Sequence, residues 1–131
     1  MAKAPLLISL AAFGASEVLR LGQLHYTRLA REAGADGVEV RAELLRDPAA
    51  ELPELAATGC VAVYSNPEPL WGADGALDPA ALERGLHVAQ LLGAERLKMS
   101  IGGFDAAGSQ GGLQALRCRL ADSPVELVIE N

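Results

Sequence analysis

The chain has 131 residues, of which 50% are hydrophobic and 21% are charged, and its formal net charge is −6. A chain of this length and composition is expected to fold as a single domain over residues 1–131. The acidic balance argues against nucleic acid and against an anionic membrane surface as partners, because both bind basic patches. The apolar runs are also shorter than the roughly 18 residues of a membrane-spanning helix.

The cysteines and the N-terminal sequence predict a cellular compartment. Neither Cys60 nor Cys118 has a second cysteine or a histidine at metal-binding spacing, so both are expected to be small core residues in a reducing cytosol. The N-terminal apolar run is short and only Lys3 carries a charge before it, so we predict a first strand there and not an export signal. These features together predict a cytoplasmic protein.

The first half of the chain alternates between apolar runs and helical patterns. Residues 6–10 form the first predicted strand, and a loop through Gly14 follows it. Residues 23–33 form the first predicted helix because their apolar residues recur at helical spacing, and Gly34 is placed to end it. The second predicted strand covers residues 36–40.

A start signal for a helix follows the second strand and recurs later in the chain. Asp47-Pro48 predicts an N-cap and first helical residue, and Pro53 is expected to kink or shorten that helix. Asp78-Pro79 predicts the start of a second such helix, which ends near Gly93. The remaining predicted elements are strand 60–65, loop 66–72, strand 96–103, helix 110–120 and strand 125–129.

Five strands therefore alternate with four helices, a pattern that predicts βαβ units and a parallel α/β sheet. Two architectures fit this pattern. One is a complete, doubly wound, flavodoxin-like domain with a strand order such as 2-1-3-4-5. The other is a partial (β/α)₈ TIM barrel with the order 1-2-3-4-5. We favour the barrel because no helix follows the last strand to cover an open sheet. In both, the active face lies at the carboxyl ends of the strands.

Several polar residues lie at these strand ends. Glu39 is flanked by valines, and an interior carboxylate is unfavourable unless it is paired or liganded. It could belong to a site or could pair with a basic group on the next strand. A pair with Arg41 is not expected, on the argument that neighbouring strand residues point to opposite faces. Lys98 could bind substrate at the carboxyl ends of the strands, or it could point outward beneath a helix.

Four further residues complete the candidate site. Tyr64 and Ser100 lie at strand ends and are predicted to contact substrate. Trp71, in the proline-rich loop, could form an apolar wall over a substrate or anchor the loop. Glu130 follows an apolar strand directly, and we predict that it acts as a metal ligand or a base, because hard divalent cations prefer oxygen ligands. His25 and His87 are both expected on helices, in a surface or helix-packing role and not as metal ligands.

Three segments carry a resemblance to a known family: "AREAGADGVEVRAELL" (30–45), "VYSNPEPLW" (63–71) and "VELVIEN" (125–131). The chain resembles the xylose isomerase-like TIM barrels, the sugar-phosphate isomerase/epimerase group. The resemblance implies aldose–ketose isomerisation or epimerisation of a small carbohydrate, with Mn²⁺ or Mg²⁺ stabilising an enediolate. It implies that Glu130 is a metal ligand and one of the acid/base pair, and that Glu39 lies near the site mouth.

The resemblance covers only part of the expected metal site. In the family the other ligands are an Asp, a His and a second Glu on strands 6–8, which this chain does not reach. We therefore expect an N-terminal half barrel that is inactive alone. It could instead be an assembly half that needs a separate C-terminal half. Its unpaired edge strands predict a homodimer or larger assembly.

Overall fold

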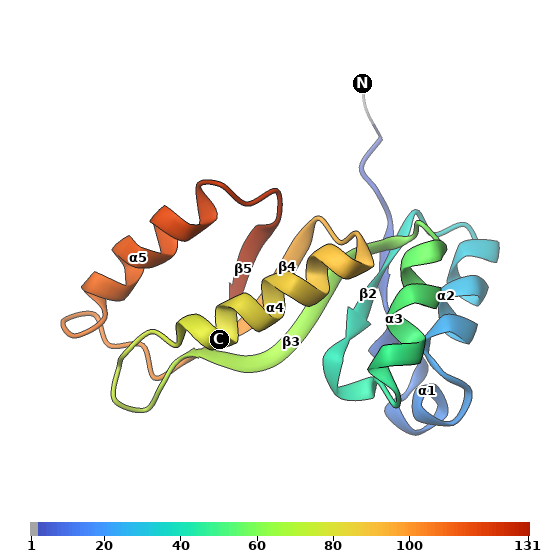
Figure 1. Cartoon of the computed structure of the whole chain (residues 1–131). Coiled ribbons are helices and arrows are strands. Elements are labelled where there is room, and N and C mark those ends of the chain that lie inside the picture. The colour runs from blue at the N-terminus through green and yellow to red at the C-terminus, as the bar shows by residue number, and fades with distance from the viewer. Residues whose placement is uncertain (1–2) are drawn as a thin grey trace.

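A computed structural model describes residues 3–131 of the chain (Figure 1). Within these residues, five strands form one sheet, and five α-helices and two short 3-10 helices connect them. The strands are β1 (Leu7–Ser9), β2 (Gly37–Arg41), β3 (Val61–Trp71), β4 (Arg96–Gly102) and β5 (Glu126–Glu130). The helices are η1 (Leu10–Phe13), α1 (Ala15–Leu21), α2 (Gln23–Glu32), η2 (Ala42–Leu44), α3 (Pro48–Ala57), α4 (Pro79–Leu92) and α5 (Gln110–Leu120).

The sheet is parallel throughout, and its strand order is β1-β2-β3-β4-β5. The predicted α/β class and the sequential order are therefore confirmed. The order contains no reversal of the kind that a doubly wound 2-1-3-4-5 sheet has. Among the described residues, β1 and β5 each have a neighbour on one side only, so the sheet has two open edges.

The two faces of the sheet differ in chemistry. Successive residues of a strand point to opposite faces, and one face carries Val38, Val40, Tyr64, Leu97 and Met99, all at most 8% exposed. This face packs against the helices, with α4 lying across β3 and β4 (Figure 1). The opposite face carries mostly polar and charged side chains, with Val63 and Val128 among them, and it positions the candidate site.

Two segments differ from the predicted elements. Residues 15–21, predicted as a loop, form α1 between Gly14 and Gly22, whose φ angles are 93° and 90°. Strand β3 continues to Trp71 through the predicted loop. The register shifts between Asn66 and Pro69, and a proline without an N–H donor is tolerated at such an irregularity.

The helix starts predicted at Asp47-Pro48 and Asp78-Pro79 are confirmed. The Asp78 side chain accepts a hydrogen bond from the Ala81 N–H at 3.1 Å and caps α4. Asp47 occupies the N-cap of α3 but does not cap it with its own side chain. The Glu51 carboxylate instead accepts the backbone N–H groups of Arg46 and Asp47, at 2.7 and 2.6 Å.

Three other predictions meet mixed outcomes. Helix α3 continues past Pro53 to Ala57, so this proline does not end it. Cys60 is buried as expected, whereas Cys118 is exposed and does not belong to the core. Between residues 3 and 131, no helix has both the length and the apolar character to cross a membrane.

Candidate functional site

The polar face of the sheet gathers side chains from four strands. Ser9 comes from β1, Glu39 and Arg41 from β2, Lys98 from β4, and Glu130 from β5. We call these five residues the strand-end cluster. In a parallel sheet the carboxyl ends of all strands meet at one edge, and ligands bind there in α/β proteins.

Glu39 lies at the centre of the strand-end cluster. Its carboxylate accepts hydrogen bonds from Ser9 Oγ at 3.0 Å, Arg41 Nη1 at 3.1 Å and Lys98 Nζ at 3.0 Å. Burial by itself raises the pKa of Glu39, but the hydrogen bonds from Lys98 and Arg41 outweigh it, and the net pKa lies below its ordinary value. The expectation that Glu39 would not pair with Arg41 was wrong, because residues two apart on a strand share a face.

Lys98 joins β2 to β5. Its ammonium lies 3.0 Å from Glu39 Oε2 and 3.5 Å from Glu130 Oε2. It reaches Glu39 across β3, where the residue in register with both Arg41 and Lys98 is the small Ser65. Lys98 therefore points into the strand-end cluster and not outward beneath a helix.

Arg41 is fixed through both its side chain and its backbone. Its Nε donates to Glu43 Oε1 at 2.8 Å, in addition to the Nη1 bond to Glu39. The Arg41 N–H donates to Gln23 Oε1 at 2.8 Å, and Gln23 Nε2 donates to the Arg41 carbonyl at 2.9 Å. Gln23 is 0% exposed. Gln23 was not among the predicted site residues, although position 23 lies on the same helical face as the buried Tyr26.

A hollow of about 200 Å³ lies at the carboxyl edge of the sheet. Ser100 and Glu130 are register partners on β4 and β5 and lie side by side at this edge. The lining residues are Arg41, Ser65, Asn66, Pro67, Ser100, Glu130 and Asn131. The hollow is smaller than the roughly 300–1,000 Å³ of a pocket for a drug-sized ligand, so it suits a small, hydrogen-bonding molecule.

Two of the predicted site residues lie elsewhere. Tyr64 lies on the helix-covered face, where burial and, to a lesser degree, Glu68 and Glu43 raise its pKa to about 12. Trp71 is 1% exposed and packs edge-on against Phe104, with ring centroids 4.8 Å apart. Glu39, Lys98, Ser100 and Glu130 thus share the polar face, and Tyr64 and Trp71 do not line the hollow.

The metal implied by the family resemblance does not fit the described residues alone. Mg²⁺ typically takes about six oxygen ligands, and no group of three or more His, Cys, Asp or Glu side chains within residues 3–131 could hold a metal ion. Glu130 contributes one carboxylate, and the Lys98 ammonium already lies beside it. His25 and His87 are exposed on helices, as expected.

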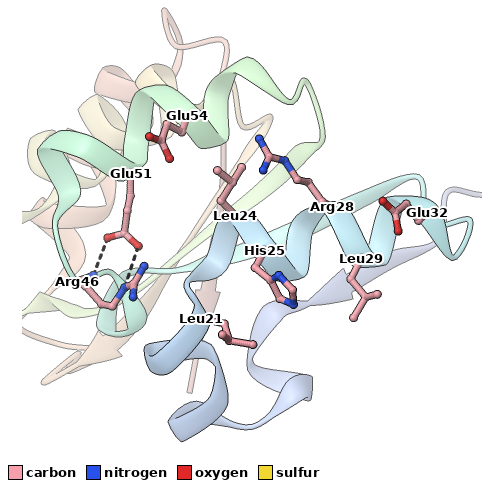
Figure 2. A pocket seen from close by; sticks show the side chains of 9 residues that line it. All are labelled: Leu21, Leu24, His25, Arg28, Leu29, Glu32, Arg46, Glu51 and Glu54. Carbon is pink, nitrogen blue, oxygen red and sulfur yellow. Dashed lines mark hydrogen bonds and ion pairs between the residues drawn. The ribbon is translucent and has the colours of Figure 1, made fainter.

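A larger hollow of about 420 Å³ lies on the helical side of the chain (Figure 2). Its lining residues are Leu21, Leu24, His25, Arg28, Leu29, Glu32, Arg46, Glu51 and Glu54. Figure 2 shows Glu51 of α3 turned toward Arg46, and Glu51 Oε1 lies 3.7 Å from Arg46 Nε. Since Glu51 also accepts the backbone N–H groups of Arg46 and Asp47, the two residues that lead into α3, its role is to hold this helix start in place.

Comparisons with known proteins place no constraint on this site. The sequence matches no protein-family model, and no curated protein matches it significantly.

Proposed function

We propose that this chain forms part of a carbohydrate isomerase or epimerase barrel of the xylose isomerase-like group and supplies its Glu130 carboxylate. The observation that carries the proposal is the position of Glu130. It lies at the carboxyl end of β5, beside Ser100 and next to a small polar hollow. The sequential parallel strand order and the polar second face support a barrel wall of this kind.

In the proposed reaction, Glu130 removes a proton from the carbon next to a carbonyl group of a small carbohydrate. Lys98 lies within 3.5 Å of Glu130 and orients its carboxylate. Ser65, Asn66 and Ser100 offer hydrogen bonds to substrate hydroxyl groups. A resident Mn²⁺ or Mg²⁺ would need ligands beyond those within residues 3–131, so no step is assigned to it, and the chain is expected to be inactive alone.

The open edges of the sheet favour association with further strands. Val128 and Ile129 on β5 are 37% and 39% exposed, and unpaired strand edges tend to pair with other strands. We propose a homodimer or larger assembly in a cytoplasmic setting; a separately encoded partner half is the alternative. A complete flavodoxin-like binding domain is less well supported, since the strand order lacks its reversal.

The proposed site can be tested by amide NMR during titration with uncharged ketoses in the presence of MgCl₂. We expect saturable shifts at Ser65, Ser100 and Glu130, and a weaker response in Glu130→Gln. The matched control is Glu126→Gln, which changes an exposed carboxylate on the same strand, paired with Arg96. Shifts that avoid these residues, or that survive in Glu130→Gln unchanged, would contradict the proposal.

A further inference from the structure

Arg41 lines the strand-end hollow, and its guanidinium is already paired with carboxylates. Its Nη2 lies 2.8 Å from Glu43 Oε1, its Nε donates to the same oxygen, and its Nη1 donates to Glu39. An arginine beside a polar hollow is ordinarily a recognition group for phosphate or carboxylate, because its planar fork binds two oxygens at once. Here two side chains of the protein take that place.

The charges around the hollow also disfavour an anion. Lys98, the other cation of the cluster, lies between Glu39 and Glu130. The two cationic groups thus face three carboxylates, those of Glu39, Glu43 and Glu130. A phosphate ester would enter a region that already carries excess negative charge and would have to displace a carboxylate from Arg41. An uncharged hydroxyl-rich ligand has no such requirement.

We propose that Glu43 is a specificity-determining residue that withholds Arg41 from anionic ligands, so that the hollow takes uncharged polyhydroxy compounds in preference to their phosphate esters. Glu43 is suited to this role by its position. It lies in η2 directly after β2, two residues from Arg41, and its side chain is 38% exposed. Glu39, by contrast, also organises Lys98 and Ser9, so Glu43 is the carboxylate that acts on Arg41 without holding the rest of the cluster. This inference rests on the proposed function insofar as both use the same hollow.

The test is an NMR titration of wild type and Glu43→Gln with glycerol, glycerol 3-phosphate and inorganic phosphate, following Arg41 Nε–Hε and the amides of Ser65 and Ser100. In wild type we expect glycerol to shift these signals and both phosphates to give no saturable response in the millimolar range. In Glu43→Gln we expect phosphate affinity to rise by about tenfold or more, the scale of one charge-assisted hydrogen bond. The double variant Arg41→Gln/Glu43→Gln should lose this gain.

The matched control is Glu17→Gln, which removes the same charge from an exposed pair with Arg20 on α1. It should bind phosphate no better than wild type. Phosphate binding by wild type as strong as by Glu43→Gln would overturn the inference, as would an equal gain in Glu17→Gln or no gain in Glu43→Gln. The glycerol arm addresses the proposed function separately: a glycerol response absent from every variant contradicts the carbohydrate site, whereas the phosphate arm alone decides the role of Glu43.

Discussion

The Glu39 carboxylate links three strands through its hydrogen-bond donors on β1, β2 and β4. A largely buried carboxylate is tolerated only when its oxygens are well satisfied, because desolvation opposes its charged form. Three donors, two of them charged, meet this requirement. The stability contributed by this arrangement therefore depends on the ionisation of Glu39.

This dependence gives a prediction for pH. Because the folded state lowers the pKa of Glu39, the associated stabilisation is present above its unfolded pKa of about 4.3 and is lost as the pH falls through the folded value. We expect the free energy of unfolding of wild type, measured with urea between about pH 6 and 3, to decline more steeply than that of Glu39→Gln. Glu126→Gln, which alters an exposed pair, should keep the wild-type slope. Parallel curves for wild type and Glu39→Gln would refute this role.

The two hydrogen bonds between the buried Gln23 side chain and the Arg41 backbone give a second prediction at this scale. Gln23→Leu removes both side-chain partners of the Arg41 backbone N–H and carbonyl. Each buried polar group left unpaired costs about 1–3 kcal/mol, so the loss of both partners should lower the unfolding free energy by about 2–6 kcal/mol. Urea denaturation at neutral pH measures this change. With the same substitution at the exposed Gln114 of α5, the free energy of unfolding should stay within about 0.5 kcal/mol of wild type. Equal losses at the two positions would contradict a stabilising role for the Gln23 hydrogen bonds.

Some features of the cluster could be predicted from residue types and others could not. The candidate positions Glu39, Lys98, Ser100 and Glu130 follow from finding polar residues in apolar strands. Strand parity also places Glu39 and Arg41 on one face, and this signal was available but misapplied. The reach of Lys98 across β3 was not predictable, because it depends on register and on the small Ser65 beneath it.

At the scale of elements, the pairing between the ends of β3 and β4 depends on Gly102. Its φ is +68°, and an added Cβ would overlap the carbonyl oxygen of Trp71. Gly59 has nearly the same φ, +66°, but open space around it. Gly59→Ala should therefore cost only the strain of a left-handed residue, about 1–2 kcal/mol. Gly102→Ala should cost more, about 2–5 kcal/mol, because steric overlap adds to that strain.

The pair of alanine variants separates steric overlap from backbone strain. Thermal or urea unfolding of both variants gives the comparison directly. A loss in Gly102→Ala no larger than that in Gly59→Ala would show that Trp71 and its strand end can move aside. It would also mean that the extension of β3 to Trp71 is not rigidly held.

The elements differ in how far the local sequence determines them. Helix α5 has the bounds predicted, and the Asp-Pro signals place the starts of α3 and α4, because caps and prolines act locally. The extension of β3 through Pro67 and Pro69 is different. It forms because Pro69 and Trp71 pair with Ser100 and Gly102 of β4, and this tertiary pairing overrides the local preference of a proline-rich segment.

For the whole molecule, the regular alternation of strands and helices predicts a parallel sheet. It fits both a sequential and a reversed strand order, so alternation alone does not determine the observed order β1-β2-β3-β4-β5. The arrangement leaves one face of the sheet polar and two edges open among the described residues. The apolar side chains at β5 are then only partly covered, since Ile129 lies on the helix side of the sheet but remains 39% exposed. Such an edge is energetically better covered by another strand or chain.

The proposed assembly gives a prediction for self-association. Wild type should show a mass above that of the monomer, rising with concentration, in sedimentation velocity or light scattering. Ile129→Lys should shift the equilibrium toward monomer, because a lysine on an edge strand opposes pairing with another strand. Leu91→Lys, at a 51% exposed leucine of α4, introduces the same change away from the edge and should leave the mass unchanged. A wild type that is monomeric at every concentration, or an equal effect of both lysines, would exclude association through β5.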